Sequence, residues 1–169
     1  KFKKFKNIEI INEDILKLLN KGIGKNFIVI GNLPYNISTK ILTLLALNNK
    51  WPPWYESLIF MFQKEVADRI IAKTNTKEFS RLSVLCNWRF EIKKHFDISK
   101  NCFIPKPKIN STILSFYPKK NYTYKIKDSK NLEFVTRILF SNRRKMINKS
   151  FLKLFKGNIY VADDLKLNL

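Results

Sequence analysis

Three short apolar runs, separated by segments with helical spacing, restrict the fold of this chain more than any other feature. Two of them, residues 26–32 ("NFIVIGN") and 57–63 ("SLIFMFQ"), are apolar at almost every position, as strands of a covered parallel sheet are. The third run covers residues 111–118 ("STILSFYP"). Helical spacing follows the first two strands, at residues 39–49 and 64–73. This order predicts an α/β fold with a parallel sheet and right-handed crossovers.

The flanking segments extend the pattern. Residues 8–11 are rich in isoleucine and predict another strand, which leads into a short helix at residues 15–19. A helix is expected at residues 81–90. Beyond it, residues 91–98 and 111–118 predict two strands joined by the proline-bearing segment "FIPKPKIN". Because no long helix separates these two strands, we expect an antiparallel hairpin that closes the sheet.

The composition changes after residue 120. Residues 121–131 are polar and basic, which is typical of a linker, and residues 132–155 have helical spacing throughout. We therefore expect an α/β domain over residues 1–120 and a small all-helical appendage over residues 121–169.

The charge of the chain indicates its class of partner. Its 33 Lys and Arg residues against 13 Asp and Glu residues give a formal net charge of +20. Such an excess repels itself in a compact protein unless a polyanion neutralises it, so nucleic acid is the leading partner and an anionic membrane surface the second. A compositional bias toward lysine is the alternative explanation, and the charge alone does not exclude it.

Metal and membrane functions have little support in the sequence. Cys86, Cys102 and His95 do not have the spacing of a zinc site, so no metal is expected. The longest apolar runs fall well short of the roughly 20 residues of a membrane span. We expect a soluble, cytoplasmic protein with reduced cysteines and no membrane partner.

The stretch "GNLPYNIST" (residues 31–39) places an amide, a proline and an aromatic ring where a strand turns into a helix. Ligands of open parallel sheets bind beyond the carboxyl ends of the strands. Pro34 stops backbone pairing and leaves carbonyl groups free. The amide of Asn32 and a fixed carbonyl can accept both hydrogens of an amino group on a planar base, and Tyr35 can stack on that base.

This corner resembles the "N-L-P-Y" motif of S-adenosylmethionine-dependent adenine amino-methyltransferases. With the segments "FQKEVADRIIAK", "RLSVL", "FDISKNCFIPKPKINSTILSF" and "FSNRRKMINKSF", the chain is similar to the ribosomal RNA adenine-N(6) dimethyltransferase family. The segment "FSNRRK" resembles the enzymes that act on small-subunit RNA. The resemblance implies a Rossmann-like methyltransferase sheet, S-adenosylmethionine as methyl donor, dimethylation of two adjacent adenosines near the 3′ end of 16S rRNA in the pre-30S subunit, and a monomeric protein.

The resemblance also assigns roles to residues. Asn32 and the carbonyl of Leu33 or Pro34 would hold the target amino group, with Tyr35 stacked on the adenine and Phe103 closing its other face. For the methyl donor, the resemblance points to Asn32 again and to Asp14, which would read the donor's adenine. The family usually has "G-D-A-L" around that aspartate, whereas this chain has "NEDIL".

Basic residues in two segments are candidates for RNA binding. The resemblance and the charge together point to Arg143, Arg144 and Lys145, which would grip phosphates near a helix start. Lys106 and Lys108 could extend this track past the mouth of the site, although a solvated surface position is the simpler interpretation for any single lysine.

Two features of the family are missing from the sequence. Methyl donors of this kind need a glycine-rich turn after the first strand and an acidic residue after the second. By resemblance, this chain begins after those strands and ends within the C-terminal helical region. We therefore expect a fragment of a longer enzyme that is a weak catalyst, or inactive, on its own.

The sequence is also compatible with two other functions. One is an RNA-binding assembly or transcription factor that kept the fold and lost catalysis, which the missing glycine-rich turn permits. The other is a DNA adenine methyltransferase, which is disfavoured because the similarity extends through the C-terminal appendage.

Overall fold

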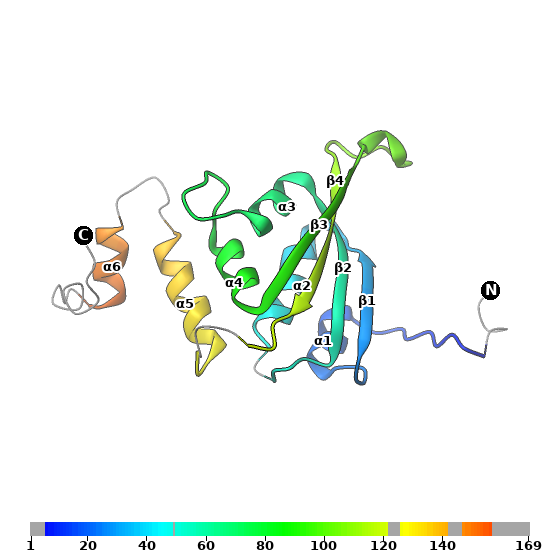
Figure 1. The fold of residues 1–169 in the computed structure, drawn as a ribbon, viewed down its shortest axis with the longest axis horizontal. Coiled ribbons are helices and arrows are strands. Elements are labelled where there is room, and N and C mark those ends of the chain that lie inside the picture. The colour runs from blue at the N-terminus through cyan, green and yellow to red at the C-terminus, as the bar shows by residue number, and fades with distance from the viewer. Residues whose placement is uncertain (1–5, 49, 122–125, 142–146, 157–169) are drawn as a thin grey trace.

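The computed structural model describes residues 6–48, 50–121, 126–141 and 147–156 (Figure 1). Across these residues the chain forms a four-stranded sheet with helices packed against it. The strands are β1 (Phe27–Asn32), β2 (Tyr55–Gln63), β3 (Phe90–Ile98) and β4 (Ser111–Pro118). The helices are α1 (Ile15–Lys21), α2 (Tyr35–Ala46), α3 (Lys64–Ile71), α4 (Arg81–Arg89), α5 (Ser129–Leu139) and α6 (Asn148–Leu154), with a 3-10 turn η1 (Lys100–Cys102).

The parallel part of the sheet is confirmed. Strands β1 and β2 pair in parallel, with Asn32 opposite Met61 at their carboxyl ends. Helix α2 connects them, so the predicted strand, helix, strand order holds here. Helix α3 follows β2 directly, because Lys64 is both the residue after the strand and the first residue of the helix.

The closing antiparallel hairpin is also confirmed, but its two strands do not follow β2 in the order in which they occur along the chain. The strand order is β1-β2-β4-β3, so β4 lies between β2 and β3 and is antiparallel to both. As a consequence, Ser111 at the start of β4 lies opposite Gln63 at the end of β2. The segment that joins β3 to β4 therefore lies at the carboxyl ends of β1 and β2.

The strand expected at residues 8–11 is wrong. In the structure this segment has no regular secondary structure, and Ile8, Ile10 and Ile11 are exposed. A strand needs a hydrogen-bonded neighbour, and the four strands of the described sheet offer none to this segment. The short helix that was expected next is present as α1, which begins after Asp14.

The core lies between the sheet and helices α2, α3 and α4. Alternate residues of β2, namely Leu58, Phe60 and Phe62, are fully or almost fully buried, and they contact buried residues of the helices and of β4. Phe116 of β4 packs against Phe60 and Phe62, with ring centroids 6.3 and 6.0 Å apart. Each buried ring removes a large apolar area from water, worth about 1.5–3 kcal/mol per side chain.

The other face of β1 is not covered by any described part of the chain. Ile28 and Ile30 are 58% and 74% exposed on this edge strand. Because β1 is also the edge strand, its outer backbone groups have no strand partner within the described sheet. Exposed apolar side chains beside such an edge are typical of a surface that associates with further chain.

Helices α5 and α6 lie at the opposite side of the structure from β1 (Figure 1). A salt bridge of 2.8 Å between Arg81 of α4 and Glu133 of α5 joins this helical part to the α/β part. Phe151 of α6 is buried, and its ring centroid lies 4.6 Å from that of Phe155. Within the described ranges, no helix is long and apolar enough to cross a membrane.

Candidate functional site

A cavity of about 300 Å³ lies at the carboxyl ends of β1 and β2. The residues that line it come from the corner after β1, from β2 and from the segment between β3 and β4, and they are Asn32, Leu33, Pro34, Tyr35, Met61, Phe103, Pro105 and Pro107. The structure thus brings together all five residues that the sequence proposed for the target base. Met61, interpreted from the sequence only as sheet core, is the neighbour of Asn32 in the sheet and also lines the cavity.

The backbone at the corner is set by Pro34. Strand β1 ends at Asn32, and Pro34 has φ −56° and ψ 126°, an extended conformation that precedes the first turn of α2. The carbonyl oxygen of Pro34 accepts the N–H groups of Ile37 and Ser38, at 3.1 and 3.0 Å. Both lone pairs of this carbonyl are therefore used by α2. Of the two carbonyl groups proposed from the sequence, that of Leu33 is the better placed to accept a further hydrogen.

Tyr35 is held through its ring hydroxyl and through its backbone. Its hydroxyl group lies 2.9 Å from Oγ of Ser111, which is fully buried at the start of β4. Its backbone carbonyl accepts the Oγ hydroxyl of Ser38 at 3.1 Å. Sequence reasoning missed Ser111, because only the pairing of β2 with β4 brings this serine to the hydroxyl group of Tyr35.

Phe103 lies on the segment of residues 99–110, which we call the β3–β4 loop. Asn110 fixes the loop, because its side-chain oxygen accepts the N–H of Lys100 at 3.0 Å and its backbone carbonyl accepts the N–H of Lys64 at 2.9 Å. Pro105 and Pro107 restrict the backbone beside Phe103. The aromatic ring at the cavity wall is thus carried by a short, tethered segment.

A charged cluster lies beside the tethered end of this loop. The Asp97 carboxylate accepts a hydrogen bond of 2.7 Å from the Thr112 hydroxyl and one of 3.0 Å from Lys94, while Lys64 lies 3.7 Å away. These contacts, with the Thr112 bond as the largest cause, hold the pKa of the Asp97 carboxyl below its ordinary value. The hydrogen bond to Asp68 does most to raise the pKa of Lys64. Both shifts favour the charged forms of Asp97 and Lys64.

Asp14 does not join the cavity. It is the N-cap of α1, where its Oδ1 atom accepts the N–H of Leu16 at 2.8 Å, and the side chain is exposed. This bond occupies one carboxylate oxygen, so the other is open to a further donor. Within the described residues, no group of three or more His, Cys, Asp or Glu side chains could hold a metal ion.

The residues proposed for RNA binding fall into two groups. Lys106 is exposed on the β3–β4 loop, and Lys108 lines a shallow depression that also includes Lys64 and Lys100. Arg143, Arg144 and Lys145 lie outside the described residues.

Comparison with solved structures gives two close folds. One is the crystal structure of a dimethyladenosine transferase from Plasmodium falciparum, with a TM-score of 0.69, 24% identity, and coverage of 99% of this chain and 60% of that chain. The other is the 23S rRNA methyltransferase ErmE, with a TM-score of 0.62, 23% identity, and coverage of 90% and 59%. These likenesses confirm the Rossmann-like α/β fold.

Comparison of sequences gives curated relatives with the name ribosomal RNA small subunit methyltransferase A. The protein from Pelagibacter ubique is 49% identical over 163 residues, which are 96% of this chain and 62% of that protein. The protein from Rhizobium etli is 42% identical over 149 residues, or 85% and 52%. The chain therefore spans less than two thirds of the length of these relatives.

A family model described as ribosomal RNA adenine dimethylase matches residues 1–166. The match includes the cavity, the β3–β4 loop and the helical part, so it does not depend on one short motif. The chain belongs to the ribosomal RNA adenine dimethylase family.

Proposed function

We propose that this protein is part of an S-adenosylmethionine-dependent enzyme that dimethylates the exocyclic amines of two adjacent adenosines near the 3′ end of 16S rRNA. The observation that carries the proposal is the cavity in which Asn32, Leu33, Tyr35 and Phe103 surround one space of about 300 Å³. That volume is at the small end of ligand sites and suits a single planar base.

The cavity residues would act on the amine through orientation. An aromatic amine is a weak nucleophile because its lone pair is delocalised into the ring. Hydrogen bonds from its two hydrogens to the Asn32 side-chain oxygen and the Leu33 carbonyl favour a pyramidal nitrogen, whose lone pair is then free to attack. Fixed acceptors of this kind supply rate through position and electrostatics, without a charged base.

The proposed roles require the base to leave its helix. An adenine within a duplex cannot reach a cavity at the end of a sheet, so the nucleotide must be flipped out of its stack. Tyr35 and Phe103 would then replace the lost stacking on the two faces of the base. The bond between Tyr35 and Ser111 supports this role because it fixes one ring before the base arrives.

S-adenosylmethionine would supply the methyl group as a sulfonium electrophile. The residues present suit one side of this donor. Asn32 borders the cavity, and the open oxygen of the exposed Asp14 can accept a hydrogen from the donor's adenine amine. We propose that further strands complete the sheet beside β1, which is supported by the exposed Ile28 and Ile30 and by the greater length of the relatives.

The names of the relatives support the choice of RNA and of the small subunit. We assign the pre-30S particle as the partner and the cytoplasm as the compartment, where this substrate is assembled, and we assign a monomer as the active form. The segment with Arg143, Arg144 and Lys145, together with Lys106 and Lys108, would contact RNA phosphates.

The test compares Asn32→Ala with Asn36→Ala in protein expressed from the complete reading frame. Asn36 is an exposed amide in the first turn of α2 and does not line the cavity, so it is a matched control. We expect Asn32→Ala to lower methyl transfer by about 100-fold or more, as loss of a fixed transition-state contact does, with RNA affinity unchanged. Equal loss of RNA affinity and methyl transfer would contradict the roles proposed here.

The same preparation separates the enzyme from a non-catalytic RNA-binding protein. If the wild-type protein binds RNA but neither binds S-adenosylmethionine in calorimetry nor transfers a methyl group, the non-catalytic alternative replaces the enzyme.

A further inference from the structure

A second and larger hollow follows the flank of α2. It has a volume of about 1600 Å³ and lies between the end of α1, helix α2, the start of α4 and helix α5. We call it the α2 groove. It shares no lining residue with the cavity at Asn32, so the two are separate features of the surface. Its volume exceeds the roughly 300–1000 Å³ of small-molecule sites, which favours a macromolecular occupant.

The charge of the α2 groove is strongly one-sided. Among the described residues that line it there is one acidic side chain, Glu133, and Arg81 neutralises it at 2.8 Å. Five lysines also line the groove, and none of them forms an ion pair within the described part of the chain. They are Lys21, Lys25, Lys40, Lys50 and Lys130. Five unneutralised ammonium groups around one hollow form a site for a polyanion.

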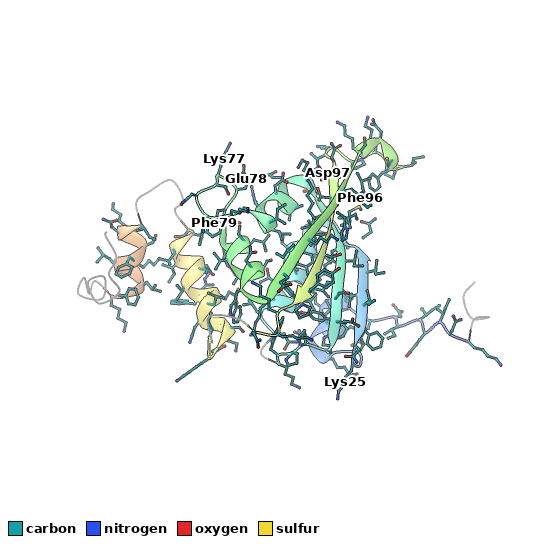
Figure 2. The ribbon with its side chains drawn as sticks, in the orientation of Figure 1. Lys25, Lys77, Glu78, Phe79, Phe96 and Asp97 are labelled. Atoms are coloured by element: carbon teal, nitrogen blue, oxygen red, sulfur yellow. The ribbon has the colours of Figure 1, made fainter. Side chains whose placement is uncertain are left out.

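The groove reaches the amino ends of the parallel strands. Lys25 precedes the first residue of β1, and Trp54 precedes the first residue of β2, whereas the cavity lies where these strands end. A six-residue strand such as β1 is about 20 Å long. Figure 2 shows Lys25 at one end of the sheet and Asp97 at the other. Asp97 accepts a hydrogen bond from Thr112, which follows Ser111 at the start of β4. One nucleotide cannot occupy both features.

The apolar part of the groove favours nucleic acid over other polyanions. Trp54, Pro53 and Leu44 line it together with the lysines. Aromatic side chains beside a track of cations are the usual components of grooves that bind single-stranded or irregular RNA, because cations contact phosphates while rings contact bases. A purely electrostatic surface would not need this apolar lining.

We propose that the α2 groove binds the backbone of the substrate RNA at a segment distant from the adenosine that enters the cavity. This inference rests on the proposed function, since it takes the methylated RNA as the occupant. When one RNA molecule binds both the α2 groove and the cavity, the second contact forms within a complex that already exists. This raises the effective concentration of the target base at the cavity. Folded RNA that reaches both features is then preferred over a short strand that fills the cavity alone.

The experiment measures binding of a labelled small-subunit rRNA fragment to this chain by fluorescence anisotropy at several salt concentrations. The groove variant is Lys25→Gln/Lys40→Gln/Lys50→Gln. The control variant carries the same substitutions at three exposed lysines that do not line the groove, Lys73, Lys120 and Lys127. Each lost phosphate contact lowers the slope of log affinity against log salt by about 0.7–0.9.

We expect the groove variant to lose about two units of that slope and about tenfold or more in affinity, while the control changes little. Equal behaviour of the two triple variants would overturn the proposal. Displacement of the labelled RNA from the wild-type chain by polyglutamate at a lower concentration of anionic groups than unlabelled RNA requires would also overturn it and would indicate an acidic protein. Because this measurement needs no methyl transfer, it stands apart from the result with Asn32→Ala.

Discussion

The hydroxyl group of Tyr35 lies 2.9 Å from Oγ of Ser111, and these residues are 76 positions apart in the chain. The bond joins the first residue of α2 to the first residue of β4. Ser111 is fully buried, whereas Tyr35 is partly exposed at the cavity. A ring tethered by its polar end keeps its face in one orientation without help from the ligand.

Ser111→Ala should therefore weaken base stacking as well as the fold. Loss of a neutral hydrogen bond costs about 0.5–1.5 kcal/mol of unfolding free energy. The freed Tyr35 ring must then be ordered when the base binds, which costs about 0.5–1.5 kcal/mol more per side chain. We expect KM for RNA to rise several-fold with little change in RNA affinity at low salt. Urea unfolding and steady-state kinetics measure the two effects.

Ser115→Ala is the matched control for this prediction. Ser115 lies on the same strand, is equally buried, and bonds the ring of His95 at 2.7 Å, away from the cavity. It should cost similar stability and leave KM unchanged. A rise in KM of the same size in both variants would mean that Ser111 acts only through stability.

Phe103→Ala should remove one face of the proposed base sandwich. Stacking of a base on an aromatic ring is worth about 1–3 kcal/mol by alanine substitution. We expect the variant to lose most of its preference for an RNA with the target adenine over one that is abasic at that position. Competition binding with the two RNAs measures this preference.

Phe96→Ala serves as the control for Phe103. Phe96 is 60% exposed on β3 and does not line the cavity (Figure 2). It should keep the preference for the adenine. If Phe103→Ala keeps it as well, the ring does not stack on the base.

Much of the fold could be predicted from local patterns. Apolar runs indicated β1 and β2, and the order of strands and helices indicated a parallel sheet, because these signals depend on burial of neighbouring residues. The same isoleucine pattern at residues 8–11 gave a wrong strand, since periodicity reports an apolar face and not a pairing partner. The position of β4 between β2 and β3 could not be predicted from the sequence either, because the pairing order of strands is decided by tertiary packing.

The candidate site likewise has residues that the sequence predicted and residues that only the fold reveals. The cluster of Asn32, Tyr35 and Phe103 followed from a resemblance to known motifs, and the structure brings these residues into one cavity. Ser111 has no motif of its own, and only the register that sets it opposite Gln63 gives it a role. The lysines of the α2 groove are scattered from position 21 to position 130, so the sequence offered only their total charge.

Gly31→Ala should disturb the corner of the cavity from within the sheet. A Cβ atom at this position would lie 2.8 Å from Cδ2 of Leu33 and 3.3 Å from Cδ1 of Phe60. Phe60 is almost fully buried and cannot move freely, so Leu33 must shift. We expect a loss of about 1–3 kcal/mol in unfolding free energy and a fall in kcat, because the Leu33 carbonyl moves with its residue.

A double-mutant cycle checks this explanation. Leu33→Val removes the Cδ2 atom that the new methyl group would meet. In the Gly31→Ala background it should recover part of the stability, as residues in contact do not act additively. Strict additivity of the two changes would show that Leu33 does not accommodate the strain.

Asp97→Asn should change the acid stability of the protein. The hydrogen bond from Thr112, with that from Lys94 and the charges of Lys64 and Lys94, lowers the pKa of the Asp97 carboxyl in the folded state below its ordinary value of 3.8. The folded state then binds this proton less readily than the unfolded state does. The stabilisation is therefore present above the ordinary pKa and is lost as the pH falls through the lowered one. Thermal unfolding measured from about pH 6 to about pH 2.5 should show a shallower acid decline for Asp97→Asn than for the wild type.

Glu91→Gln is the control for the pH series, because Glu91 is exposed on the same strand and forms no ion pair within the described part of the chain. Its acid decline should match that of the wild type. Thr112→Val supplies the second check, since it removes the largest cause of the shift and leaves the carboxylate in place. It should flatten the acid decline in part, and an unchanged decline would mean that the lysines alone hold Asp97 ionised.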